Sequence, residues 1–192
     1  LEGSPKLGAA VYAGYVADAK PGEPGQDFVT GNKIFIKNFS GEIPMLRNAE
    51  LVSVDSTATV IFPDAKDAQI AGVSRLLNGG TIVIKGAPVV WQNVTYFGTG
   101  RVVLDPGQGN TGLVLDVGIM EAPLRLDVAA PAGGKLAPFK ARPVVVLTKP
   151  VFGKGMDREK AVELINPTAG GLKLSLKRSV DGDKDVWKLS AE

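Results

Sequence analysis

The chain has 192 residues, of which 44% are hydrophobic and 22% charged, a composition typical of a globular protein rather than a disordered one. Its 22 Lys and Arg against 20 Asp and Glu leave a net charge of +2, which does not favour binding to nucleic acid or to an anionic membrane surface. The absence of Cys and His excludes thiol nucleophiles, zinc–thiolate sites and His-dependent catalysis, so we do not expect an enzyme.

Short β-strands are expected along the whole chain, because runs of alternating apolar and polar residues are separated by turns rich in its 24 Gly and 13 Pro. The clearest alternation lies in residues 172–177, where Leu takes every second position. The expected strands cover residues 9–17, 33–39, 50–62, 81–85, 88–97, 100–104, 113–117, 123–128, 142–148, 172–180 and 186–190.

Two short helices are expected beside these strands. Asp64 can cap a helix in which Ile70, Val73 and Leu77 share one face. A second helix is expected over residues 157–165, where it begins with an Asp and is stopped by an Asn-Pro pair.

The spacing of the turns, roughly one every 8–12 residues, is typical of a β-sandwich or barrel. We therefore predict an antiparallel two-sheet β-sandwich, jelly-roll-like, with one or two short helices, forming a single domain over residues 1–192. An apolar run ended by Asp recurs in residues 102–105, 113–116 and 124–127, at a spacing of 11 residues. A parallel solenoid would stack these Asp residues into a ladder, but three short copies favour an antiparallel meander of equal hairpins.

The N-terminal segment is apolar on both faces, so a strand there needs cover on each side. It is either the central strand of its own sandwich or a strand that is donated to a neighbouring subunit. In the second case residues 1–17 form the exchanged strand and the Gly- and Pro-rich residues 18–26 its spacer. The residues expected to form the assembly strand are Ala9, Val11, Tyr12, Ala13, Tyr15 and Val16.

A calcium site is the best metal candidate. Asp181, Asp183 and Asp185 have the spacing of the first oxygen ligands of a calcium loop, and Glu192 stands at position 12. Val186 occupies the position where such a loop needs Gly, and this favours the alternative, a solvated hairpin turn. We expect no other cofactor.

The residues from Gly107 to Gly112 match the glycine pattern of a dinucleotide site. That site requires a following helix, whereas a strand is expected here, so a glycine-rich loop is the better interpretation. Four aromatic residues could form a sugar-stacking platform, although burial in the core is the expected place for them: Trp91, Tyr96, Phe97 and Trp187.

The general character of the chain is similar to that of β-sandwich subunits of extracellular filaments, tubes and viral capsids or tails. This resemblance implies a structural subunit that polymerises with copies of itself through β-strand contacts. It would act outside the cell or at the cell surface after removal of a signal peptide, or in a virion, and no stretch is long and apolar enough for a membrane span. The alternatives are a monomeric carbohydrate- or protein-binding β-sandwich module and a hydrolase that uses carboxylates such as Asp116 and Glu121.

Overall fold

A computed structural model describes residues 11–12, 33–65, 68–86, 88–105, 112–116, 118–130 and 142–191. Nearly every element in these ranges is a β-strand, and the strands belong mainly to one 13-stranded sheet and one 6-stranded sheet. The elements are β1 (Val11–Tyr12), β2 (Lys33–Ile36), β3 (Ser40–Glu42), β4 (Met45–Val54), β5 (Thr59–Phe62), β6 (Gln69–Asn78), β7 (Thr81–Lys85), β8 (Val89–Trp91), β9 (Thr95–Phe97), β10 (Arg101–Asp105), β11 (Leu113–Leu115), β12 (Ile119–Met120), β13 (Leu124–Val128), β14 (Arg142–Thr148), β15 (Val151–Phe152), the 3-10 turn η1 (Arg158–Lys160), β16 (Val162–Leu164), β17 (Thr168–Ala169), β18 (Leu172–Asp181) and β19 (Lys184–Ala191).

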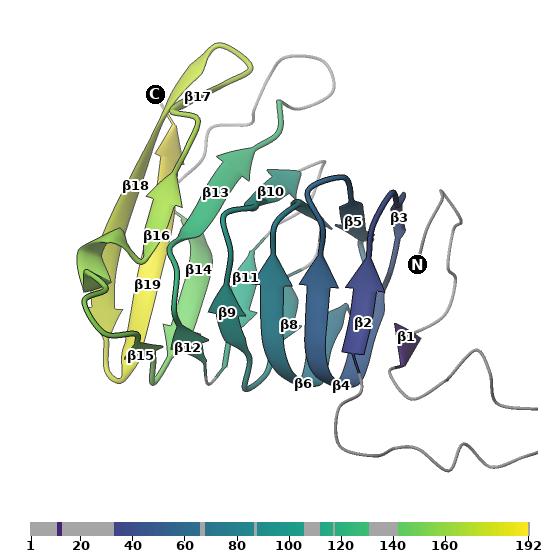
Figure 1. Ribbon diagram of the computed structural model, residues 1–192. Coiled ribbons are helices and arrows are strands. Elements are labelled where there is room, and N and C mark those ends of the chain that lie inside the picture. The colour runs from purple at the N-terminus through teal and green to yellow at the C-terminus, as the bar shows by residue number, and fades with distance from the viewer. Residues whose placement is uncertain are drawn as a thin grey trace, which may run out of the picture.

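The chain winds as a coil and adds a parallel strand to each sheet with every turn (Figure 1). In the smaller sheet Thr59 of β5 pairs with Thr81 of β7, Thr81 with Arg101 of β10, and Arg101 with Arg125 of β13. Between these strands the chain visits the larger sheet through β6, then β8 and β9, then β11 and β12. One turn of the coil therefore takes between 20 and 24 residues, as the paired positions show.

The larger sheet is curled because its strands bend at residues in the left-handed backbone region. Asn48, Gly72, Asn93 and Lys149 have φ values of 55°, 63°, 54° and 49°. Each stands where one turn of the coil changes direction, and a bend of this kind suits Asn and Gly. The bends give the coil three faces. The first face contains the whole of β1, β8, β11 and β14 and the first halves of β4 and β6. The second face contains the whole of β2, β9, β12 and β15 and the second halves of β4 and β6. The third face is the 6-stranded sheet of β3, β5, β7, β10, β13 and β16.

The core lies inside the coil and consists of stacked columns of apolar side chains. Val60, Ile82, Val102 and Leu126 are neighbours in register on the third face, and all four are buried. Because parallel strands lie about 4.8 Å apart, each column keeps side chains in contact from one turn to the next. Asn78 is a buried polar residue at a corner, where its amide donates to the Arg101 carbonyl at 3.3 Å and accepts from the Gly80 N–H at 3.2 Å.

An antiparallel unit closes the C-terminal end of the first face. β19 pairs antiparallel with β14 and with β18, and β18 pairs with β17. The hairpin of β18 and β19 brings Leu174, Trp187 and Leu189 into the buried core cluster. We call β17, β18 and β19 the C-terminal cap.

The predicted antiparallel, jelly-roll-like sandwich is wrong. All described strand pairs are parallel except the three in the C-terminal cap region, β14–β19, β18–β19 and β17–β18. The 11-residue repeat corresponds to about half a turn of the coil, because residues 102–105 and 124–127 lie on the third face and residues 113–115 on the first. The meander of hairpins favoured for this repeat is therefore wrong, because β7, β10 and β13 pair in parallel. The Asp ladder of the solenoid alternative is not formed by these strands either, since Asp105 pairs with Lys85 and Asp127 with Val103.

The two predicted helices are also wrong, since η1 is the only helical turn among the described residues. Residues 69–78 form β6, in which Ile70, Val73 and Leu76 are buried at a spacing of three. The bend at Gly72 accounts for the first of these two steps. This spacing resembles that of an amphipathic helix. In the second region Asp157 does cap a helical turn, accepting from the Glu159 N–H at 2.9 Å, but the turn ends at Lys160 and strand β16 follows.

Candidate functional site at the two ends of the coil

The N-terminal end of the coil is formed by strands that occupy the positions of a first turn. On the first face Val11 and Tyr12 of β1 pair in parallel with Leu46 and Arg47 of β4. On the second face all four residues of β2 pair with the remainder of β4, and on the third β3 pairs with β5. The outer edge of β4 is therefore shared by two separate N-terminal segments, whereas its inner edge pairs with β6.

The structure places part of the predicted assembly strand at this end. Val11 and Tyr12 form β1, while Ala9, Ala13, Tyr15 and Val16 lie outside the described residues, as does the predicted spacer 18–26. Twenty residues separate Tyr12 from Lys33, the first residue of β2. In the next turn Arg47 is the partner of Tyr12 and Leu51 is the partner of Lys33, and only three residues separate Arg47 from Leu51. The first turn thus contains a long insertion between its first and second faces.

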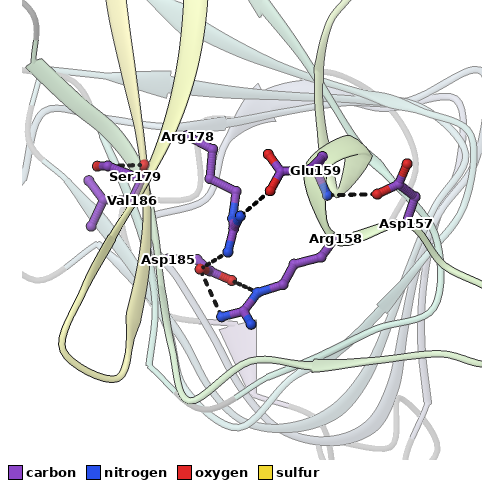
Figure 2. Close-up of polar contacts among 7 residues, drawn as sticks. All are labelled: Asp157, Arg158, Glu159, Arg178, Ser179, Asp185 and Val186. Carbon is purple, nitrogen blue, oxygen red and sulfur yellow. Dashed lines mark hydrogen bonds and ion pairs between the residues drawn. The ribbon is translucent and has the colours of Figure 1, made fainter.

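The C-terminal end holds a cluster of charged side chains around one buried carboxylate (Figure 2). Asp185 of β19 is fully buried and accepts from Arg158 at 2.7 Å (Nε to Oδ2) and 2.9 Å (Nη2 to Oδ1). It also accepts from Arg178 Nη2 of β18 at 2.6 Å. Arg178 donates with its other terminal nitrogen to Glu159 of η1. These four residues, the Asp185 cluster, connect η1 with both strands of the hairpin.

The electrostatics of the Asp185 cluster keep its groups charged. Burial raises the pKa of Asp185, but the hydrogen bonds and positive charges of Arg158 and Arg178 together lower it by more than burial raises it. The pKa of Asp185 therefore lies below its ordinary value. The hydrogen bond to Asp185 raises the pKa of Arg158 in turn. Each guanidinium also lies over an aromatic ring, Arg158 5.8 Å from the centre of Phe152 and Arg178 6.0 Å from that of Trp187. The cluster is suited to holding the cap in place.

The carboxylates of the three aspartates of the predicted calcium site lie in different environments. Asp185 is engaged by two arginines, Asp183 lies 4.0 Å from Lys149, and Asp181 is exposed. They belong to the β18–β19 hairpin expected as the alternative, although Asp185 is buried and not solvated as that alternative assumed. The part of the chain that the structure describes contains no group of three or more metal-ligating side chains placed to hold an ion. Calcium binding stays a prediction, and it would require Asp185 to leave its arginine partners.

The other predicted sites have partial outcomes. The glycine pattern lies outside the described residues except for Gly112, and strand β11 follows it as expected. Trp91, Tyr96 and Trp187 are buried, so the expected core position is confirmed for them, while Phe97 is half-buried on the second face. The hydrolase hypothesis stays a prediction.

Sequence reasoning missed Arg158 and Arg178 as partners of Asp185, although one signal was present. Asp185, Trp187 and Leu189 occupy alternate positions of one strand, so they share a face. Since that face carries a Trp and a Leu, the carboxylate of Asp185 is expected to be buried with them. A buried carboxylate needs a cation or several N–H donors. Which arginines provide them depends on the winding of the chain.

Comparison with known proteins gives no relative. The sequence matches no protein-family model, and no curated protein or solved structure is significantly similar to it. Among the described residues no helix is long and apolar enough to cross a membrane. The proposals below therefore depend on the geometry alone.

Proposed function

We propose that this chain is a structural subunit that assembles with copies of itself through β-strand contacts at the N-terminal end of the coil. The observation that supports the proposal most directly is the pairing of β1 with the outer edge of β4 at Leu46 and Arg47. A strand added to a sheet edge binds through its main chain, so a copy of the same segment from another subunit can make identical hydrogen bonds.

The connection of β1 favours exchange between subunits. Among the described residues, Val11 and Tyr12 pair with β4. The twenty residues between Tyr12 and Lys33 can span up to about 65 Å when extended. The same connection therefore allows β1 to reach its own β4 or that of a neighbour.

The two ends of the coil differ in a way that gives the subunit a direction. At the C-terminal end β18 carries the exposed Lys177 beyond the two residues that pair with β17, and an edge lysine opposes the addition of a further strand. At the N-terminal end β2 and β3 are each paired on one side among the described residues. Assembly through β1 into a filament, tube or capsid-like polymer outside the cell, at the cell surface or in a virion is the function that we propose.

Cysteine cross-linking tests the exchange of β1 between subunits. The chain has no Cys of its own, so only the introduced cysteines can form disulfides. Tyr12 and Arg47 are partners in register, at the separation of about 5 Å that a disulfide accepts. The Tyr12→Cys and Arg47→Cys proteins are mixed in urea, refolded together and then oxidised. We expect the mixture to form a disulfide-linked heterodimer. Tyr12→Cys mixed with Lys188→Cys, an exposed position on β19, serves as the control. Equal heterodimer yields in the two mixtures would contradict exchange.

Deletion of residues 1–17 tests the consequence for assembly. The shortened chain should remain folded, since the described core columns begin with β2, but it should not polymerise. Electron microscopy and circular dichroism of the two proteins provide the measurement. Polymers formed by the deletion variant would exclude β1 as the assembly strand.

A further inference from the structure

A cationic surface lies on the outer side of the cap, where β18 pairs with β19. Lys177 of β18 and Lys188 of β19 are direct partners in register, and both are exposed. Partners in an antiparallel pair share a face, with Cβ atoms about 5 Å apart, so the two lysines stand side by side. Lys173 continues the surface on the same side of β18, about 14 Å along the strand from Lys177. We call these three residues the lysine face.

No acidic side chain balances the paired lysines within the part of the chain that the structure describes. Neither Lys177 nor Lys188 forms an ion pair there. The first acid along this side of β18, Asp181, stands at the turn, where it is the partner of Lys184. The described neighbours of the two lysines on this side of β18, β19 and β14 are uncharged: Ser175, Ser179, Val186, Ser190, Pro143 and Val146.

The opposed lysines reduce the stability of the hairpin, because like charges directly across an antiparallel pair repel each other. Protection of an open sheet edge accounts for Lys177 but not for Lys188, since β19 is paired on both sides, with β14 and with β18. An anion that binds between the two ammonium groups offsets the repulsion. The arrangement therefore fits a ligand with negative charges.

The inner side of the hairpin fixes the spacing of the two lysines. The pair next to them in register is Arg178 and Trp187. Arg178 donates to the buried Asp185 at 2.6 Å and lies 6.0 Å from the centre of the Trp187 ring. The lysine face is thus supported by the Asp185 cluster and is preorganised, which lowers the entropy that a ligand loses on binding.

We propose that the lysine face binds an acidic polysaccharide, in which carboxylate or sulfate groups recur along an extended chain. The paired lysines hold one anionic group, and Lys173 contacts another further along the polymer. Ser175 and Ser190, which are partners between these two positions, present hydroxyl groups that can donate to or accept from the sugar oxygens. This binding is independent of β1 exchange, which takes place at the opposite end of the coil.

The neighbouring side chains favour a polysaccharide over other polyanions. Side chains alternate along a strand, so Trp187 points to the inner side, and the described residues around the lysines provide no aromatic ring on which a nucleobase could stack. Val146 is half-buried and Val186 only 7% exposed, so they offer little apolar surface for insertion into a membrane.

Titration calorimetry with two probes, heparin for sulfate groups and polygalacturonate for carboxylate groups, tests the proposal. We expect the wild-type chain to bind at least one probe, and Lys177→Gln combined with Lys188→Gln to weaken that binding at least tenfold. The control, Lys33→Gln combined with Lys154→Gln, removes the same charge from two exposed positions away from the cap and should change the affinity less than twofold. Absence of binding to both probes, or equal losses in the two double variants, would overturn the proposal. Tighter binding to duplex DNA or to vesicles of anionic phospholipid would overturn the choice of a polysaccharide.

Urea denaturation without any polysaccharide separates ligand binding from a structural role. Lys188→Gln relieves the repulsion with Lys177, so the variant should unfold at a higher urea concentration than the wild type while it binds the probe more weakly. A residue that serves stability alone would give the opposite shift. A Lys188→Gln variant that unfolds at a lower urea concentration would therefore contradict the proposal.

Discussion

At the scale of single residues, Asp185 supports more of the C-terminal end than any other polar side chain that the structure describes. Its carboxylate is buried and accepts from two arginines, one on η1 and one on β18. Arg178 is itself largely buried, with 12% of its side chain exposed, so removal of its partner leaves a guanidinium away from water.

Replacement of Asp185 should therefore lower stability markedly. We expect Asp185→Asn to reduce the free energy of unfolding by about 3 kcal/mol, because the amide carries no charge and its NH2 group, in place of Oδ2, cannot accept the hydrogen bond from Arg158 Nε. Urea denaturation followed by circular dichroism measures the change. The control is Asp183→Asn, whose exposed carboxylate lies 4.0 Å from Lys149, and it should change the free energy by less than about 0.5 kcal/mol. Equal effects of the two changes would contradict the structural role of Asp185.

The same residue predicts a dependence on pH. Burial raises the pKa of Asp185, but the two arginines lower it below its ordinary value, so folding favours the ionised form. The stabilisation is fully present above the unfolded-state pKa of about 4 and is lost as the pH falls through the lower folded-state pKa. We expect the stability difference between the wild-type chain and Asp185→Asn to be constant from pH 8 to about 5 and to shrink below about 4. A difference that stays constant down to pH 2 would argue against an ionised Asp185 in the folded state.

At the scale of elements, the corners of the coil require glycine where two turns approach closely. A Cβ on Gly100 would stand 2.4 Å from the Gly80 carbonyl oxygen and 2.7 Å from Asn78 Oδ1. On Gly112 the nearest heavy atom of the described residues would be the Pro143 oxygen at 3.6 Å. Neither glycine has a φ in the left-handed region, so the two positions differ chiefly in space.

We expect Gly100→Ala to destabilise the chain by about 3 kcal/mol, because backbone atoms must move to admit the methyl group. Gly112→Ala should stay within about 0.5 kcal/mol of the wild type. Thermal unfolding of the two variants, measured side by side, checks the difference. If both alanines are tolerated equally, the close approach of β7 and β10 at this corner is not as the structure describes it.

The elements themselves were predictable where alternation is regular. β7 and β14 begin and end at the predicted residues, and β18 continues the Leu alternation of residues 172–177. The prediction failed at β6, because the left-handed Gly72 shifts the burial pattern by one residue between Ile70 and Val73, and the next buried residue, Leu76, is again three positions on. A sequence pattern cannot distinguish such a bend from the period of a helix without knowledge of the backbone angle at Gly72.

At the scale of the whole molecule, the sequence could not settle the direction of strand pairing. Leu126 lies between the polar residues Arg125 and Asp127, as it would in an antiparallel hairpin, yet it is the neighbour of Val102 in the adjacent turn of a parallel coil. The 11-residue spacing was visible, but half a coil and one hairpin step take about the same number of residues. For the candidate sites, the apolar Val11 and Tyr12 and the acidic residues of the hairpin were identifiable, whereas the exposed Phe35, Leu77 and Ile119 share one face only because of the coiling.

The coil also predicts how the two ends differ in local stability. In a repeating architecture each turn is stabilised by its neighbours, so terminal turns open first unless they are held. β2 and β3 pair on one side within the described residues, and so do β15 and β16 at the opposite end. The latter strands, however, flank η1, which the Asp185 cluster ties to the cap.

Hydrogen exchange measured by mass spectrometry should therefore show slower exchange in peptides that contain β15 and β16 than in peptides that contain β2 and β3. Asp185→Asn should remove this difference by releasing η1 from the hairpin, so exchange in β15 and β16 should accelerate more than exchange in β7 and β10, in the middle of the coil. The comparison separates local opening from global destabilisation, because a purely global effect would lower the protection of all these strands by the same free energy. If β15 and β16 keep their protection in the variant, packing of the cap against the core, and not the charged cluster, holds the C-terminal end closed.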